Sequence, residues 1–299
     1  MHRFRTPALA LLATATLFAQ PATAQESATL KKIKDSGTIA LGHRESSIPF
    51  SYYDDKQQVV GYSHELMLKV VDAVKAELKL PNLAVKLTPV TSQNRIPLVQ
   101  NGTVDIECGS TTHNAERARQ AAFSNTIFII GTRLMTKKDS GIKDFPDLAG
   151  KNLVTTAGTT SERLVRKMND EKKLGMNIIS AKDHGEAFLT LETGRAVAFM
   201  MDDALLYGEM AKARKPTDWT VVGTPQSFEA YGCMMRKDDP GFKKLVDGAL
   251  AKAMTSGEAE AIYKKWFTQP IPPKGLNLNF PLSEAMQKLY KAPNDKAFE

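Results

Sequence analysis

The chain has 299 residues, of which 24% are charged, and its formal net charge at pH 7 is +7. Basic and acidic residues are closely interspersed, as in KKIKDSG (31–37) and RKDDPGFKK (236–244), without a sustained cationic run or interleaved aromatic residues. This distribution is typical of a solvated surface and argues against a nucleic-acid-binding protein.

The first 24 residues predict export. Arg3 and Arg5 precede an apolar run over 8–19, and the run is followed by Ala22-Thr23-Ala24, a small-residue pattern typical of signal-peptide cleavage. The run is shorter than the ~20 residues that a membrane-spanning helix needs, and no Cys near the cleavage pattern could carry a lipid. We therefore expect a signal peptide over 1–24. The exported chain has a net charge of +5, because residues 1–24 hold two arginines and no acids.

Strand-like and helix-like segments alternate through the first half of the exported chain. Leu66, Val70, Val74 and Leu78 recur at helical spacing and predict a helix over 62–80. The remaining predictions in this half are strands at 38–44, 84–90 and 103–109, a short helix at 95–101 and a long extended segment at 127–138. This order is typical of α/β units on a largely parallel sheet.

A second alternation starts after the polar stretch at 140–150. Its predicted strands are 151–158, 176–181, 196–203 and 219–223, and its predicted helices are 159–173, 184–194 and 204–215. A strand at 229–237 then leads to helices around 240–255 and 257–267 and to a C-terminal helix from Ser283. Two such series predict two lobes, with one lobe formed by 25–130 and 230–299 and the other by 131–229. The chain would then cross between the lobes twice, and a ligand would lie in the cleft beyond the strand ends.

The predicted strand ends are unusually polar. Arginine stays charged and pairs with a carboxylate through two parallel bonds, so several arginines at one sheet edge predict a ligand with more than one anionic centre. The candidates after the strand ends are Arg44, Ser92, Arg95, Ser110, Thr112 and Arg117 in the first half, and Thr159, Thr160, His184 and Asp202 in the second.

Arg95 follows Ser92 in TSQNR (91–95), in the first turn of a predicted helix. A cation is disfavoured there by the helix dipole, unless an anion lies nearby. In GTTSE (158–162), Thr159 and Glu162 have the spacing of a capping box, and the same turn leaves N–H groups that can hold a carboxylate. Of Asp202 and Asp203, one is expected to cap a helix, and the other is left near the cleft, where it could bind an ammonium group.

Catalytic and metal-binding motifs are absent. The sequence holds no H-E-x-x-H, C-x-x-C, G-x-S-x-G or phosphate-binding loop, and its five histidines lack metal-ligand spacing. Cys108 and Cys233 are the only cysteines, and in an oxidising compartment one disulfide is slightly favoured over two free thiols.

Four segments carry a specific resemblance: GHRESSIPFSYYDD, TSQNRIPLVQNGTVDIECGSTT, SAKDHGEAFLTLETGRAVAFMMDDALL and EAYGCMMRKDDP. In these segments the sequence resembles the periplasmic glutamate/aspartate-binding proteins of ABC-type importers, within bacterial solute-binding protein family 3. The resemblance implies a two-lobed type II periplasmic-binding fold that closes on free L-glutamate or L-aspartate. It also implies a periplasmic monomer without a cofactor, and delivery to an ABC permease of the inner membrane.

The resemblance also assigns roles to residues. Ser110, Thr112 and Arg117 hold the ligand's α-amino and α-carboxylate groups, with Arg117 on the carboxylate and Asp202 on the ammonium. Thr159 and Thr160 contribute from the second lobe. Arg44, Ser92, Arg95 and His184 surround the side-chain carboxylate. Two alternatives remain: an exported enzyme of the same fold that uses His184 as an acid or base, and a sensory module with a different partner.

Overall fold

The computed structural model describes residues 27–297, so the predicted signal peptide and its cleavage pattern lie outside the described residues. The α-helices are α1 (Ala28–Ser36), α2 (Tyr62–Leu78), α3 (Arg95–Gln100), α4 (Ala115–Ala118), α5 (Thr160–Lys172), α6 (His184–Glu192), α7 (Asp203–Lys212), α8 (Pro240–Thr255), α9 (Glu258–Phe267) and α10 (Glu284–Lys291). Two short 3-10 helices are η1 (Phe145–Leu148) and η2 (Pro216–Asp218).

The strands are β1 (Thr38–His43), β2 (Ser46–Ser47), β3 (Ser51–Tyr53), β4 (Val59–Val60), β5 (Ala84–Pro89), β6 (Ile106–Glu107), β7 (Thr112–His113), β8 (Ala122–Lys137), β9 (Asn152–Thr156), β10 (Asn177–Ala181), β11 (Ala198–Asp202), β12 (Trp219–Val222), β13 (Phe228–Met235), β14 (Pro270–Ile271) and β15 (Leu276–Asn277).

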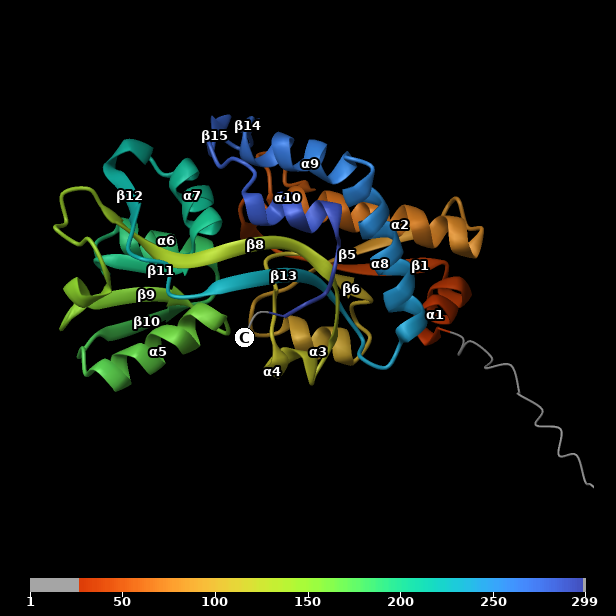
Figure 1. Ribbon diagram of the computed structural model, residues 1–299, viewed down its shortest axis with the longest axis horizontal. Coiled ribbons are helices and arrows are strands. Elements are labelled where there is room, and N and C mark those ends of the chain that lie inside the picture. The colour runs from red at the N-terminus through yellow and green to blue at the C-terminus, as the bar shows by residue number, and fades with distance from the viewer. Residues whose placement is uncertain (1–26, 298–299) are drawn as a thin grey trace, which may run out of the picture.

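One sheet runs through the whole molecule in the order β10-β9-β11-β8-β13-β6-β1-β5. The long strands β8 and β13 lie in its middle and pair antiparallel with each other, whereas β1 pairs parallel with β5 and β6, and β9 pairs parallel with β10 and β11. In Figure 1, β8 and β13 cross the centre, with β9 to β12 and α5 to α7 at one end and β1, β5, β6, α1 to α4 and α8 at the other. We call the end with β1, β5, β6, α1 to α4 and α8, together with α9 and α10, lobe 1. We call the end with β9 to β12 and α5 to α7 lobe 2.

The predicted long elements are present. Leu66, Val70 and Val74 are fully buried on one face of α2, as their helical spacing predicts. The strand predicted at 103–109 is much shorter, because the Asp105 carboxylate accepts the Ala40 N–H at 2.9 Å. Only Ile106 and Glu107 of that segment join the ladder.

An aromatic cluster anchors lobe 1 to the crossing strands. Phe50, Tyr62, Phe128, Tyr231 and Phe267 pack with ring centroids 4.8 to 6.3 Å apart, mostly edge to face. Such pairs add about 0.5–1.5 kcal/mol each to the free energy gained by burial. Phe128 lies on β8 and Tyr231 on β13, so this core fixes both crossing strands against α2 and α9.

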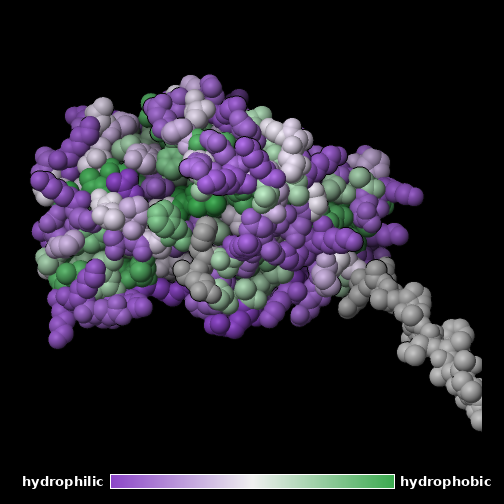
Figure 2. Space-filling model, in the orientation of Figure 1, coloured by the Kyte–Doolittle hydropathy of each residue, from purple (hydrophilic) through white to green (hydrophobic). Residues whose placement is uncertain are grey.

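The visible face of the molecule is mostly hydrophilic, and its apolar residues form separate patches (Figure 2). Among residues 27–297, no helix combines the length and the apolar character that crossing a membrane requires.

Candidate functional site

Three arginines lie buried where the lobes meet. Arg44 follows β1, Arg95 begins α3 and Arg117 lies in α4, and each side chain is at most 2% exposed. Buried cations are costly unless paired. Burial and the neighbouring Arg95 lower the pKa of Arg44 to about 10 and that of Arg117 to about 9, while burial lowers the pKa of Arg95 as well. The three guanidinium groups therefore create a region that favours an anion.

The guanidinium group of Arg95 has one nitrogen that is hydrogen-bonded to the protein, Nη1, and one buried nitrogen without a partner, Nε. Its Nη1 donates to the Ser110 carbonyl at 3.0 Å and to Thr111 Oγ1 at 2.6 Å, and Thr111 in turn donates to the Glu107 carboxylate at 2.6 Å. Its Nε is buried without a partner. This arrangement fixes the guanidinium plane and leaves Nε available to an acceptor.

The turn before α3 explains how Arg95 reaches this position. Thr91 N–H donates to Asn94 Oδ1 at 2.8 Å, and Asn94 N–H donates to Thr91 Oγ1 at 3.3 Å. The helix therefore begins three residues after Ser92, at Arg95 itself. The Ser92 hydroxyl is buried and has no hydrogen-bond partner.

Arg44 and His184 lie on the same side of the site as Arg95. Arg44 Nη1 donates to Ser110 Oγ at 3.4 Å. His184 begins α6, and its Nδ1 lies 2.8 Å from Thr156 Oγ1, whereas its buried Nε2 has no partner. Burial, followed by Arg44 and Arg95, holds the pKa of His184 well below its usual value, so the imidazole is neutral. When the Thr156 hydroxyl donates to Nδ1, the ring proton lies on Nε2 and can be donated.

Arg117 reaches from lobe 1 to lobe 2. Asn114 caps α4 by accepting the Arg117 N–H at 2.9 Å, and the side chain donates from Nη1 to the Thr112 carbonyl at 3.1 Å. Its Nη2 donates to the Gly158 carbonyl, just before α5, at 3.3 Å.

The start of α5 has half of the expected capping box. Thr159 Oγ1 accepts the Glu162 N–H at 3.0 Å, as its spacing predicts. The Glu162 carboxylate accepts the N–H of Gly158 at 2.8 Å instead of that of Thr159. The capping side chains therefore take up the N–H groups of Glu162 and Gly158, and the carboxylate-binding role of this turn stays a prediction.

Asp202 ends β11 and occupies the N-cap position of α7, and Asp203 is the first residue of that helix. Asp203 Oδ1 accepts the Ala204 N–H at 2.8 Å at the start of α7, whereas Asp202 makes no capping bond with its side chain. Asp202 accepts hydrogen bonds from Tyr231 OH, from Thr132 Oγ1 at 2.9 Å and from Ser161 Oγ at 3.4 Å. Burial and the nearby Glu229 raise the pKa of Asp202 to about 8, and a cationic group beside it would favour its ionised form.

The structure thus brings the ten predicted site residues to the junction of the lobes, each buried or half-buried. Sequence reasoning missed Glu107, Glu229 and Tyr231, which lie next to them. Glu229 carried a usable signal, because a charged residue inside an otherwise apolar strand is rarely buried without a partner. The two cysteines form a disulfide, with Cys108 directly after β6 and Cys233 in β13.

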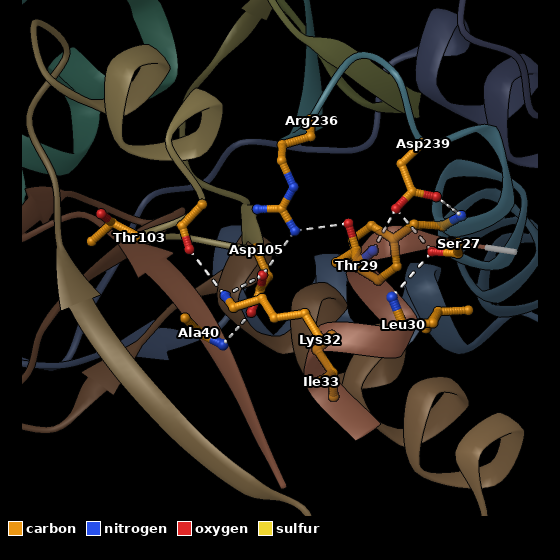
Figure 3. Close-up of polar contacts among 12 residues, drawn as sticks. Ser27, Thr29, Leu30, Lys32, Ile33, Ala40, Thr103, Asp105, Arg236 and Asp239 are labelled. Carbon is orange, nitrogen blue, oxygen red and sulfur yellow. Dashed lines mark hydrogen bonds and ion pairs between the residues drawn. The ribbon is translucent and has the colours of Figure 1, made fainter. Parts of the chain in front are cut away.

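A second buried polar cluster, drawn in Figure 3, lies beside α1, which Figure 1 shows at the end of lobe 1 away from lobe 2. There Asp105 pairs with Lys32 and Arg236 at 2.8 and 3.1 Å, and Asp239 accepts hydrogen bonds from Ser27 Oγ and the Thr29 N–H at 2.9 and 2.7 Å. Both carboxylates are satisfied by α1 and its surroundings, so this cluster attaches α1 to the sheet.

A two-lobed α/β molecule with polar groups from both lobes converging on one buried junction defines the class of bilobal ligand-binding receptors. Residues 39–269 match the family model of the bacterial extracellular solute-binding proteins, family 3, and the chain belongs to this family. The resemblance noted in the sequence is confirmed at this level. The family is one of solute-binding proteins, which argues against the alternative of a catalytic His184.

The names of close relatives specify a solute. The chain is 67% identical over 287 residues to the L-glutamate/L-aspartate-binding protein of Pseudomonas aeruginosa, covering 95% of each chain. It is 62% identical over 300 residues to the glutamate/aspartate import solute-binding protein of Escherichia coli K12, covering 99% of each chain.

Solved structures show the same fold. An arginine-binding protein mutant from T. maritima aligns with a TM-score of 0.71 at 26% identity, over 80% of this chain and 98% of that chain. A solute receptor for L-cysteine from Neisseria gonorrhoeae aligns with a TM-score of 0.70 at 25% identity, over 80% and 93%. The predicted two-lobed fold is therefore confirmed.

Proposed function

We propose that this protein captures L-glutamate and L-aspartate between its lobes and delivers them to the permease of an ABC importer. The observation that carries the proposal is the burial of Arg44, Arg95 and Arg117 at one junction, opposite Asp202. Each ligand has two carboxylates and one ammonium group, and this set of charges matches all three. The names of relatives at 62% and 67% identity support the same solutes.

The side-chain carboxylate is assigned to the group with unpartnered donors. Ser92 Oγ, Arg95 Nε and His184 Nε2 are all buried without hydrogen bonds, and buried polar atoms of this kind are rare. Arg44 adds charge beside them. A carboxylate here would accept from all these groups, whereas the neutral amide of glutamine would place its N–H₂ against donors.

The α-substituents are assigned to the remaining groups. Arg117 and the backbone N–H groups of the α5 turn at Thr159 and Thr160 hold the α-carboxylate, and Asp202 holds the ammonium with Ser110 and Thr112 nearby. Charge-assisted hydrogen bonds contribute about 1.5–3 kcal/mol each, which compensates for removing the ligand's charges from water.

Ligand binding favours the closed arrangement, because its partners come from both lobes. In the structure the lobes already meet through Arg117 and the Gly158 carbonyl, and through the Gly185 N–H and Ser46 Oγ at 3.3 Å. The lobes are bounded at 25–130 with 230–299 and at 131–229. The pairing of Ile130 with Glu229 on the crossing strands supports these bounds. We further propose a periplasmic monomer released by cleavage of the signal peptide 1–24.

Calorimetry with L-glutamate, L-aspartate, L-glutamine and L-asparagine tests the function. We expect one molecule of either acidic amino acid to bind per chain, and each amide to bind at least about a hundredfold more weakly, from the loss of roughly two charge-assisted bonds. Equal affinity for glutamate and glutamine would refute the proposal. Mass spectrometry of the incubated ligand should recover it unchanged.

A further inference from the structure

Glu229 lies on β13, is 4% exposed, and links hydroxyl groups from both lobes. Its Oε2 accepts a hydrogen bond from Thr112 Oγ1 in lobe 1 and another from Thr160 Oγ1 in lobe 2, the latter at 2.7 Å. Its Oε1 accepts from Ser227 Oγ at 3.3 Å. No role in the proposed recognition of the solute has yet been assigned to this carboxylate.

The two threonine hydroxyls are constrained by these bonds. A hydroxyl has one proton to donate and two lone pairs that accept. Because an ionised carboxylate can only accept, Thr112 and Thr160 must direct their protons to Glu229. Toward any other partner, both hydroxyl oxygens can then act only as acceptors.

Acceptor-only oxygens complement an ammonium group, which only donates, and oppose a carboxylate, which only accepts. The second buried acid lies close by. Tyr231, two residues after Glu229 on the same strand, donates to Asp202, and the hydroxyls of Thr132 and Ser227 connect the two carboxylates. The crossing strands therefore give the junction an acidic side, and Arg44 and Arg95 give it a basic side.

We propose that Glu229 is a positioning residue that fixes the hydroxyls of Thr112 and Thr160 as acceptors and thereby selects ligands with a free α-ammonium group. This inference rests on the proposed function and deepens it. Thr112 accepts directly from the ammonium, and Thr160 excludes a carboxylate oxygen from the position of its hydroxyl. Glu229 acts through these two residues and does not itself touch the ligand.

The test compares L-glutamate with glutarate, which keeps both carboxylates and lacks the ammonium. In Glu229→Gln the new amide can itself donate a hydrogen bond. The hydroxyls of Thr112 and Thr160 then need not direct their protons to residue 229, and they are no longer restricted to accepting from the ligand. We expect glutamate affinity to fall by about tenfold or more, from the loss of roughly one hydrogen bond to a charged group. Glutarate affinity should stay within about twofold, because no bond to the ammonium exists to be lost.

Asp105→Asn is the matched control, since Asp105 is a fully buried acid in the distal cluster of Figure 3. It should lower the melting temperature and leave the glutamate-to-glutarate affinity ratio unchanged. If Glu229→Gln does not fold, Thr160→Val takes its place. It removes the hydrogen bond from the half-buried Thr160 to Glu229 and should lower the ratio of glutamate affinity to glutarate affinity.

The outcomes separate the two proposals. Suppose that the wild-type protein binds glutamate, and that a folded variant binds glutamate and glutarate either both equally more weakly or both with unchanged affinity. This result overturns the positioning role alone. A wild-type protein that does not bind glutamate overturns the proposed function, and this inference with it. A ratio that narrows in Glu229→Gln or Thr160→Val but not in Asp105→Asn supports the positioning role.

Discussion

Arg95→Met should weaken glutamate and aspartate binding strongly. The unpartnered Nε and the guanidinium fork to which it belongs offer a carboxylate two parallel bonds, each contributing about 1.5–3 kcal/mol. Losing both costs about 3–6 kcal/mol, which corresponds to a roughly 10²- to 10⁴-fold weaker affinity. Glutamine loses less, because its amide cannot form two charge-assisted bonds with Arg95, so discrimination between the two ligands should narrow.

The same change removes the cation near the buried Glu107, and leaving a buried charge uncompensated destabilises a fold by about 3–5 kcal/mol. Arg95→Lys is therefore measured beside it, because lysine keeps the charge and loses the planar fork. Arg119→Met, an exposed arginine that follows α4, is the control for removing one positive charge. Calorimetry and thermal unfolding should be run on all three. Folded Arg95→Met and Arg95→Lys variants with wild-type affinity would show that Arg95 does not bind the ligand.

Three further predictions concern proton release, closure and the disulfide. Because burial and Glu229 raise the pKa of Asp202 to about 8 in the free protein and an ammonium favours its ionised form, binding at pH 7 should release up to one proton, and affinity should rise with pH toward 8. Calorimetry in two buffers of different ionisation enthalpy measures this release, which Asp202→Asn should abolish while weakening every α-amino acid alike; persistence of the release would assign it elsewhere. In Gly208→Ala the new methyl would lie 2.1 Å from the Ile48 carbonyl across the lobe junction, so glutamate binding should lose about 1–3 kcal/mol, whereas Gly248→Ala meets nothing within 4 Å and should leave binding unchanged. Equal affinities of the two glycine variants would contradict a steric block of closure. Replacing Cys108 and Cys233 by alanine should lower the free energy of unfolding by about 2–5 kcal/mol in denaturant titrations, because the disulfide closes a loop with a sequence separation of 125 residues; an unchanged midpoint would contradict this.

Periodicity in the sequence predicted the long elements well, because their apolar spacing reflects one buried face. The helix predicted at 240–255 coincides with α8. Helix α9 starts one residue later than the helix predicted at 257–267 and ends at the same residue. The predicted extended segment at 127–138 overlaps β8, which begins five residues before the segment and ends one residue before its last residue. Helix α1 was missed, since only Thr29 and Ile33 of its nine residues are buried and its apolar pattern is short.

The candidate site was predictable where polar residues follow strand ends, since the fold brings those ends to one edge of the sheet. Glu229 and Glu107 were not predicted, because each lies inside a strand and its partners come from distant segments. Thr160, for example, is 69 residues away from Glu229 along the chain. Sequence shows that such a charge must be satisfied, but only the three-dimensional arrangement shows which groups satisfy it.

The place of β13 in the sheet constrains how the protein is made. This strand lies between β8 and β6, so it is the piece that joins the lobe 2 strands to β6, β1 and β5. A nascent chain that has emerged only as far as residue 227 has the sequence of every other strand of this sheet, but its β8 and β6 each lack one neighbour. Exposed strand edges of this kind are prone to aggregation, so a chain that emerges from its N-terminus needs protection until residues 228–235 arrive.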